Sequence, residues 1–195
     1  MKVIGITGGI GSGKSLVTNI MKDKYGAVVL NTDAIAKAQM EPDGVSYPEV
    51  VGFFGTGILT QSGTIDRNKL SAIAFQDKDK LLTLNAITHP KVLTEVKREI
   101  ALHRELGDTP YLIIETALMI ESGYDTVCDE VWYVYAPEER RRDWLKRERN
   151  FTDQKIDIIF DNQSKEEAFR SRFRVTIENV GDIPELEEQI QRILD

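Results

Sequence analysis

The chain has 195 residues, of which 41% are hydrophobic and 29% charged, and its formal net charge is -7. This length suffices for one sizeable hydrophobic core with a small additional subdomain. The acidic balance disfavours a general nucleic-acid binder, which carries a basic face. No uncharged apolar stretch approaches the about 20 residues of a membrane span, and the first residues lack the pattern of a signal peptide. We therefore expect a single cytoplasmic domain that contacts neither nucleic acid nor membrane, with an oligomeric state that the sequence leaves open.

Five short apolar runs alternate with helical patterns along the chain, at 3–6, 27–30, 111–114, 131–135 and 175–177. Strands separated by helices form βαβ units, and these build a parallel sheet covered on both faces. Several of the runs are almost entirely apolar, as strands buried on both sides are. We therefore predict an α/β fold with a five-stranded parallel sheet flanked by helices.

Directly after the first run, residues 8–15 match the pattern G-x-x-x-x-G-K-S of a phosphate loop, ahead of a helical pattern over 16–22. Glycines let backbone N–H groups turn toward anionic oxygens, and the following helix adds the positive end of its dipole. Lys14 is expected to reach the β- and γ-phosphates of ATP, and Ser15 to place its hydroxyl on Mg²⁺. The alternative is a glycine-rich turn without a ligand. The predicted nucleotide-binding residues of this segment are Gly9, Ile10, Gly11, Ser12, Gly13, Lys14, Ser15 and Leu16.

Two carboxylates follow predicted strands, at the edge of the sheet where such folds bind ligands. Asp33 lies just beyond the second run and can accept a proton from an attacking hydroxyl, or cap the helix that starts at Ala34. Glu115 ends the third run and can hold the water shell of Mg²⁺. The alternative for Glu115 is plain solvation at the end of a strand.

The segment between the second and third runs is too long for a simple crossover and must hold an insertion. We expect helices at 66–75 and 81–87, and another that begins at Pro90 and continues to Leu106. The stretch 44–63 is rich in glycine and is expected to form mobile turns. The expected division is a core of 1–40, 108–137 and 172–195, a helical insertion at about 60–105 and a lid at about 138–165.

Basic residues gather at 140–149, in a helix that starts after Pro137. Their guanidinium groups can close over a transferring phosphoryl group. The alternative is a solvated helix in which they pair with nearby acidic residues. We expect only one or two of them to touch the ligand.

Together these residues resemble the dephospho-CoA kinase family, whose members transfer the γ-phosphate of ATP to the ribose 3′-hydroxyl of dephospho-CoA. The resemblance spans nearly the whole chain and rests on the phosphate loop, Thr32–Ala36, Asp66–Leu70, Leu84–Pro90 and Glu178–Asn179. It implies a P-loop NTPase-type core that holds ATP with Mg²⁺, an insertion that holds the acceptor, and a lid. The residues it implies are Asp33 as general base, Arg67 and His89 at the acceptor, and Asn179 near the adenine.

This chain departs from the family pattern at several positions. Asn31 stands where the family usually has an acidic residue, and Ala117 where it has a proline. The usual lid arginines align to Trp144, Glu148 and Ile159. The neighbouring Arg147 and Arg149 can serve instead, and we predict Arg147 as the catalytic lid arginine. The main rival is therefore a nucleoside or deoxynucleoside monophosphate kinase on the same scaffold. A nucleotide-binding module without transfer activity is the second rival.

Overall fold

The computed structural model describes residues 1–161, 163 and 165–195. The described chain divides into two compact units. The first unit, Met1–Leu30 with Ile100–Asp195, holds nearly all of the β-sheet, and the second, Asn31–Glu99, is mainly helical. In the described ranges no helix has both the length and the apolar character needed to span a membrane.

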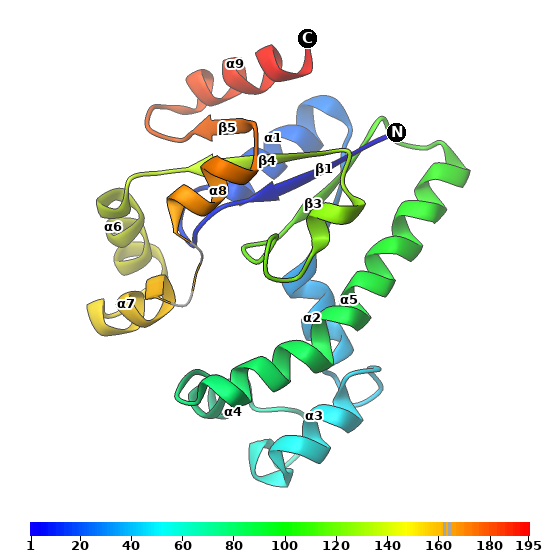
Figure 1. Ribbon diagram of the computed structural model, residues 1–195, viewed down its shortest axis with the longest axis vertical. Coiled ribbons are helices and arrows are strands. Elements are labelled where there is room, and N and C mark those ends of the chain that lie inside the picture. The colour runs from blue at the N-terminus through cyan, green and yellow to red at the C-terminus, as the bar shows by residue number, and fades with distance from the viewer. Residues whose placement is uncertain (162, 164) are drawn as a thin grey trace. The chain divides into compact units, whose positions relative to one another are not determined.

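Five strands form a single sheet in the order β2-β3-β1-β4-β5 (Figure 1). They are β1 (Lys2–Thr7), β2 (Val28–Asn31), β3 (Tyr111–Glu115), β4 (Glu130–Tyr135) and β5 (Val175–Glu178). β1 pairs in parallel with both β3 and β4, and β4 pairs in parallel with β5. The predicted five-stranded parallel sheet is therefore confirmed. Because β1 is central, the loop that follows it opens at the carboxyl edge of the sheet, where the strand order reverses and ligands usually bind.

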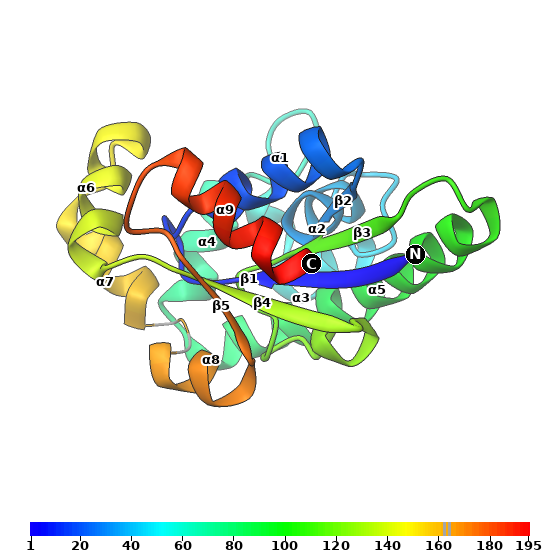
Figure 2. The ribbon, with the colours of Figure 1, turned by 90° about the horizontal axis from the view of Figure 1, so that it is seen from above.

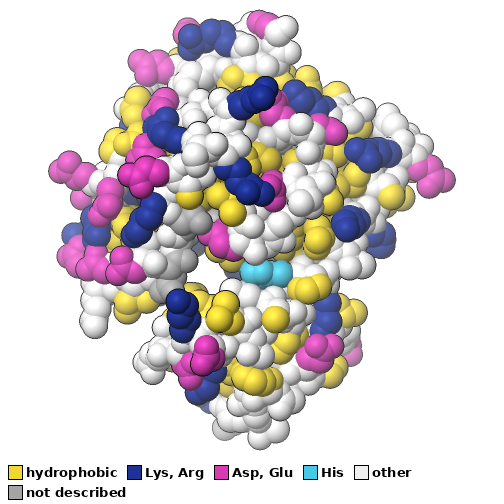
Figure 3. Space-filling view, viewed as in Figure 1, with side chains coloured by type: hydrophobic (Ala, Val, Ile, Leu, Met, Phe, Trp, Pro, Cys, Tyr) yellow, Lys and Arg dark blue, Asp and Glu magenta, His cyan; other side chains and the backbone are white. Residues whose placement is uncertain are grey.

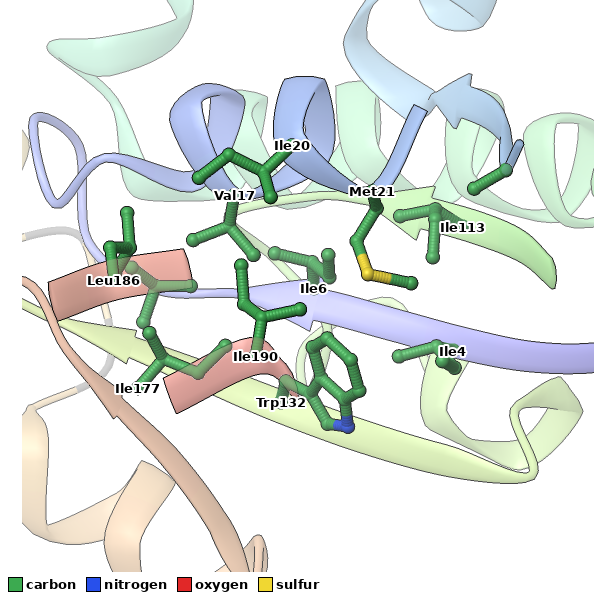
Figure 4. Close-up of a cluster of buried hydrophobic side chains, with 12 residues drawn as sticks. Ile4, Ile6, Val17, Ile20, Met21, Ile113, Trp132, Ile177, Leu186 and Ile190 are labelled. Atoms are coloured by element: carbon green, nitrogen blue, oxygen red, sulfur yellow. The ribbon is translucent and has the colours of Figure 1, made fainter. Parts of the chain in front are cut away.

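Helices cover both faces of the sheet. α1 (Lys14–Tyr25) and α9 (Ile183–Leu194) lie together on one face, and α8 (Glu166–Arg172) lies on the other (Figure 2). Between the sheet and the first pair, Figure 4 shows the main core, in which Trp132 of β4 is completely buried. Its other fully buried members include Ile4, Ile6, Val17, Met21, Ile113, Val134, Ile177 and Ile190. On the opposite face Phe169 of α8 stacks on Tyr133, with ring centroids 4.8 Å apart.

Two further helices of the first unit follow β4. α6 (Glu138–Arg149) ends at Asn150, which adopts the left-handed conformation, and α7 (Asp153–Asp161) comes next. Ion pairs join the two helices, from Arg142 to Asp157 at 2.6 Å and from Lys146 to Asp153 at 2.6 Å. The segment expected to form a lid thus begins with two charged helices that ion pairs hold together.

The second unit is built from α2 (Thr32–Gln39), α3 (Tyr47–Phe54), α4 (Arg67–Phe75) and most of α5 (Lys78–Leu106). Its core is small and centres on Val50, Ile58 and Leu70. The expectation of mobile turns over 44–63 is wrong in part, because α3 forms inside this stretch. Val50 is fully buried, and this apolar contact stabilises a helix that the glycine content alone disfavours.

The expectation that a helix begins at Pro90 is also wrong. Pro90 lies inside α5, which continues without a break from Lys78 to Leu106. Apolar residues on both sides of the proline are held in place by packing, with Ile87 partly buried and Val92 fully buried. This packing offsets the cost of about 3 kcal/mol that proline carries in a helix interior.

Candidate active site

The phosphate loop follows β1 and depends on glycine for its path. Gly8 has φ of 149°, and a Cβ atom added there would lie 2.3 Å from the carbonyl oxygen of Val134. Gly11 and Gly13 have φ of 78° and 96°, a region that favours glycine. The Ser12 N–H donates to the Gly9 carbonyl at 3.1 Å, which closes the loop on itself. Glycine at these positions therefore sets the shape of the cradle.

The loop leads straight into α1, and Gly13 is the N-cap residue of that helix. Gly13 has no side chain to bond to the first N–H groups of the helix. An uncapped helix N-terminus next to a glycine-rich turn attracts anions. Asn179, which follows β5, donates from Nδ2 to the Ser12 carbonyl at 2.8 Å. The structure thus brings Asn179, predicted near the adenine, to the phosphate loop.

Lys14 and Ser15 are the first two residues of α1, and their side chains form hydrogen bonds with different partners. The Lys14 ammonium donates to the carbonyl oxygens of Gly8 and Gly9 at 2.9 and 3.1 Å, so it lies along the loop. The Ser15 hydroxyl donates to Oε1 of Glu115 at 2.8 Å. Glu115 is only 7% exposed, so the alternative of a solvated strand end does not hold for it.

The pair of Ser15 and Glu115 has the chemistry that Mg²⁺ requires. Both side chains offer oxygen ligands, and they meet within hydrogen-bond distance at the end of the cradle. Mg²⁺ at nucleotide sites is held by one or two protein oxygens, phosphate oxygens and waters, so a larger acidic cluster is not needed. Within the described part of the chain, no group of three or more His, Cys, Asp or Glu side chains forms such a cluster.

Two side chains from the segment after β4 contact the loop, and the sequence analysis did not single them out. Nε of Arg141, on α6, donates to the Ile10 carbonyl at 2.8 Å. The Ile10 N–H in turn donates to Oε1 of Gln163 at 3.0 Å. The arginine cluster indicated that one or two guanidinium groups meet the ligand, but helical spacing alone did not indicate which ones. No sequence signal pointed to Gln163.

The other cations of α6 have partners away from the loop. Arg147, the predicted lid arginine, is 75% exposed and pairs with the adjacent Glu148 at 2.7 Å. Arg142 pairs with Glu138 at 2.8 Å and with Asp157 at 2.6 Å, and hydrogen bonds to these two carboxylates hold the pKa of Arg142 above its ordinary value. Figure 3 shows acidic and basic side chains interspersed over α6 and α7. Most of the cluster is therefore the solvated, ion-paired helix that the sequence analysis gave as the alternative.

The predicted acceptor residues belong to the second unit. Asp33 is exposed at the start of α2, and it forms no hydrogen bond or ion pair with any other described residue. The cap of that helix is Asn31, whose side chain accepts from the Ala34 N–H at 2.9 Å, so the capping role offered for Asp33 is wrong. Arg67 pairs with Glu41 at 3.2 Å, and His89 lies inside α5.

Comparisons with known proteins agree on the type of protein. A family model described as dephospho-CoA kinase matches residues 2–185. The dephospho-CoA kinase of Carboxydothermus hydrogenoformans is 37% identical over 197 residues, which cover 100% of this chain and 93% of the relative. That of Geobacter sulfurreducens is 37% identical and covers 99% and 97%.

Solved structures share the fold. The structure of TT1252 from Thermus thermophilus has a TM-score of 0.81 and 28% identity, covering 99% of this chain and 96% of that one. A dephospho-CoA kinase from Campylobacter jejuni has a TM-score of 0.68 at 21% identity and covers 100% and 96%. A shikimate kinase from Acinetobacter baumannii, at 17% identity, has a TM-score of 0.55 and covers 100% and 93%.

A central strand that leads through a phosphate loop into a helix, with a buried carboxylate bonded to the loop serine, is the nucleotide site of a P-loop protein. The match to the family model and to the relatives places the chain among the P-loop kinases. The chain belongs to the dephospho-CoA kinase family. The predicted fold class, the predicted enzyme class and the family resemblance are thereby confirmed.

Proposed function

We propose that this kinase transfers the γ-phosphoryl group of ATP to the ribose 3′-hydroxyl of dephospho-CoA and releases coenzyme A and ADP. The observation that carries this assignment is the phosphate loop, with Ser15 bonded to buried Glu115, in a chain that the family model matches over residues 2–185. The monophosphate-kinase rival is not favoured, because the family model and both relatives are described as dephospho-CoA kinases.

The loop residues bind and orient the triphosphate. Backbone N–H groups of 9–15 and the start of α1 surround the phosphates, and Lys14 moves from the loop carbonyls to the β- and γ-phosphate oxygens. Ser15 and Glu115 would hold Mg²⁺, which would neutralise part of the phosphate charge when bound. Catalysis by this set is mainly positioning and electrostatic stabilisation.

Asp33 is the proposed general base. As the 3′-oxygen bonds to the γ-phosphorus, the bond from that phosphorus to the β-γ bridging oxygen breaks and the hydroxyl proton passes to the carboxylate. The lack of a partner for Asp33 among the described residues supports this role, because the carboxylate is not used by the helix cap. Arg67 and His89 are the proposed contacts to the acceptor.

The decisive experiment is to incubate the protein with ATP, Mg²⁺ and a panel of acceptors, and to weigh the products. We expect phosphorylation of dephospho-CoA and not of nucleoside or deoxynucleoside monophosphates. Products formed only from the monophosphates would overturn the assignment. Nucleotide binding without product from any acceptor would instead favour a binding module.

The role of Asp33 has its own test. Asp33→Asn is expected to lower kcat by about 10² to 10⁴ while the affinity for ATP changes little, because a general base contributes to the chemical step. A matched control is Asp43→Asn, which removes an exposed carboxylate from the same unit. Equal activity of Asp33→Asn and the parent protein would exclude Asp33 as the base.

A further inference from the structure

Arg141 differs from the other basic residues of α6 in where its charge lies. The other basic residues of α6 contact acidic side chains, a backbone carbonyl outside the phosphate loop, or an aromatic ring. These contacts are Arg140 to the Gly181 carbonyl, Arg142 to Glu138 and Asp157, Lys146 to Asp153, Arg147 to Glu148, and Arg149 over the Trp144 ring. Arg141 has no such carboxylate partner within the described ranges, and it is directed at the phosphate loop.

The guanidinium of Arg141 lies between the phosphate loop and Phe160 of α7. Its Nε donates to the Ile10 carbonyl at 2.8 Å. Its outer nitrogens lie over Gly9, where an added Cβ atom would be 2.2 Å from Nη2 and 2.8 Å from Nη1. Its Cζ atom lies 4.2 Å from the ring centre of Phe160 on α7. The Nη donors thus lie against the loop while the rest of the group is held in place.

Gly9 is also where the Lys14 ammonium binds, since Lys14 donates to the Gly8 and Gly9 carbonyls. Two cations therefore meet at one short segment of backbone. Burial lowers the pKa of the Arg141 guanidinium below its ordinary value, so the surroundings disfavour its charge. Buried charge is costly unless an anion compensates it, and two neighbouring cations increase that cost. The anion that this loop accommodates is a phosphate group.

We propose that Arg141 is a catalytic residue of this kinase, whose Nη donors contact the γ-phosphoryl group on the side of Gly9 while Lys14 contacts it from the loop. The inference rests on the function proposed above. The lysine of a phosphate loop reaches the β- and γ-phosphates, so a second cation beside it at Gly9 lies at the end where transfer occurs. A planar guanidinium matches the phosphoryl oxygens with two donors at once, and it strengthens its contacts as charge spreads over them.

This assignment also accounts for the missing lid arginines. The family arginines align to Trp144, Glu148 and Ile159, none of which carries a positive charge. Arg141 lies one turn before Trp144 on the same helix and supplies a guanidinium from a different position. Arg147, next to Glu148, is directed to solvent. The chain therefore supplies the catalytic cation from the first half of α6.

The test compares Arg141→Gln, Arg141→Lys and Arg142→Gln by kcat and by the dissociation constant for ATP. An arginine that stabilises phosphoryl transfer contributes about 10³ to 10⁵ in kcat, and we expect Arg141→Gln to lose at least about 10². Arg141→Lys is expected to recover part of that loss. The matched control, Arg142→Gln, removes the other guanidinium near Phe160, at 5.0 Å, without touching the loop, and should stay within about threefold of the parent. A kcat for Arg141→Gln within threefold of the parent, or a larger loss for Arg147→Gln, would overturn the proposal.

A readout that does not depend on the acceptor is binding of ADP with Mg²⁺ and aluminium fluoride, which mimics the phosphoryl group in transit. Groups that stabilise the transition state bind such mimics more tightly than the ground state. Arg141→Gln should weaken this complex at least tenfold more than it weakens ADP alone. Equal weakening of both would reduce Arg141 to a structural role. A parent protein that binds the mimic but does not phosphorylate dephospho-CoA would refute the proposed function and leave this inference standing.

A second variant tests the position of the group without removing it. In Gly9→Ala the new methyl group meets the flexible end of Arg141, so the guanidinium is displaced while the fold is retained. We expect Gly9→Ala to lower kcat in the parent and to add much less loss in the Arg141→Gln background. Multiplicative losses in the double variant would show that Gly9→Ala acts independently of Arg141 and would contradict the proposed contact.

Discussion

The two units of the molecule differ in how their cores are built. The sheet unit closes a large core between five strands and two helices, and its central residues, such as Ile113 and Trp132, are fully buried. The helical unit centres on Val50, Ile58 and Leu70, with mostly partly buried residues around them. The phosphate loop is therefore held by a rigid, well-packed support. The proposed acceptor residues stand on a thin core that can open at lower cost.

The largest expected difference between the units comes from removing the same side chain in each. Ile113→Ala and Ile58→Ala both delete a fully buried isoleucine. Such changes lower the free energy of unfolding by about 2 to 5 kcal/mol. We expect Ile113→Ala near the upper end and Ile58→Ala near the lower end, because a small core relaxes more easily into the cavity that the missing side chain leaves. Urea unfolding measures the free energy of unfolding of each variant, and the affinity for ATP shows whether the phosphate loop is still folded.

The comparison predicts that Ile58→Ala keeps its affinity for ATP. Equal costs for the two variants, with loss of ATP binding in both, would show that the units unfold as one cooperative body. Ile58→Val serves as the mild control, with an expected cost of about 0.5 to 1.5 kcal/mol.

A smaller effect is expected at the start of the helical unit. Asn31→Ala removes the side-chain oxygen that accepts from the Ala34 N–H, and loss of an N-cap costs about 0.5 to 2 kcal/mol. The destabilisation should appear in the second unit as faster amide hydrogen exchange in α2, with exchange in β1 unchanged. Asn31→Asp keeps the cap and should behave as the parent protein does. Slower or unchanged exchange in α2 of Asn31→Ala would contradict the assignment of Asn31 as the cap.

The smallest effect concerns an ion pair of the sheet unit. Burial raises the pKa of Glu130, but hydrogen bonds from Lys2 at 2.8 Å and Trp132 at 3.0 Å outweigh it and lower the pKa from 4.5. Because the folded-state pKa is lowered, this group stabilises the fold above the unfolded-state pKa and loses that contribution as pH falls through the folded value. Glu130→Gln should therefore cost up to about 1 kcal/mol at neutral pH.

The pH dependence separates this contribution from packing. The difference between Glu130→Gln and the parent should shrink as the pH falls below 4.5. Lys2→Met removes the same pair from the other side and should show the same trend. A difference that stays constant from neutral to acidic pH would mean that the change acts through shape and not through charge.

Much of the sheet unit could be predicted from local sequence. The apolar runs predicted all five strands to within a residue or two at their ends, because a buried strand is a run of consecutive apolar residues. The loop was equally clear, since glycine spacing and a following lysine are local requirements of phosphate binding. Ser15 was predicted from the loop motif and Glu115 from its position at the end of a strand, and the structure brings the Ser15 hydroxyl to 2.8 Å from Oε1 of Glu115.

The helical unit was predicted less well for a physical reason. Glycine and proline are local signals for turns and helix starts, yet α3 forms across Gly52 and α5 continues through Pro90. In both helices the burial of apolar residues outweighs local preference, and burial depends on partners far away in the sequence. The helix cap was likewise misplaced by two residues, from Asn31 to Asp33.

The candidate site depends partly on local sequence and partly on packing between residues that are far apart in the chain. Residue type and spacing were sufficient to predict the phosphate loop, the carboxylate of Glu115 at the end of β3, and a cluster of cations after β4, because these are properties of neighbouring residues. The role of Asp33 stays a prediction. Which cation meets the loop depends on how α6 packs beside it, and that packing directs Arg141 to Gly9 and Arg147 to solvent. Residues six positions apart on one helix point about 120° away from each other, so the contact was fixed only when the chain folded.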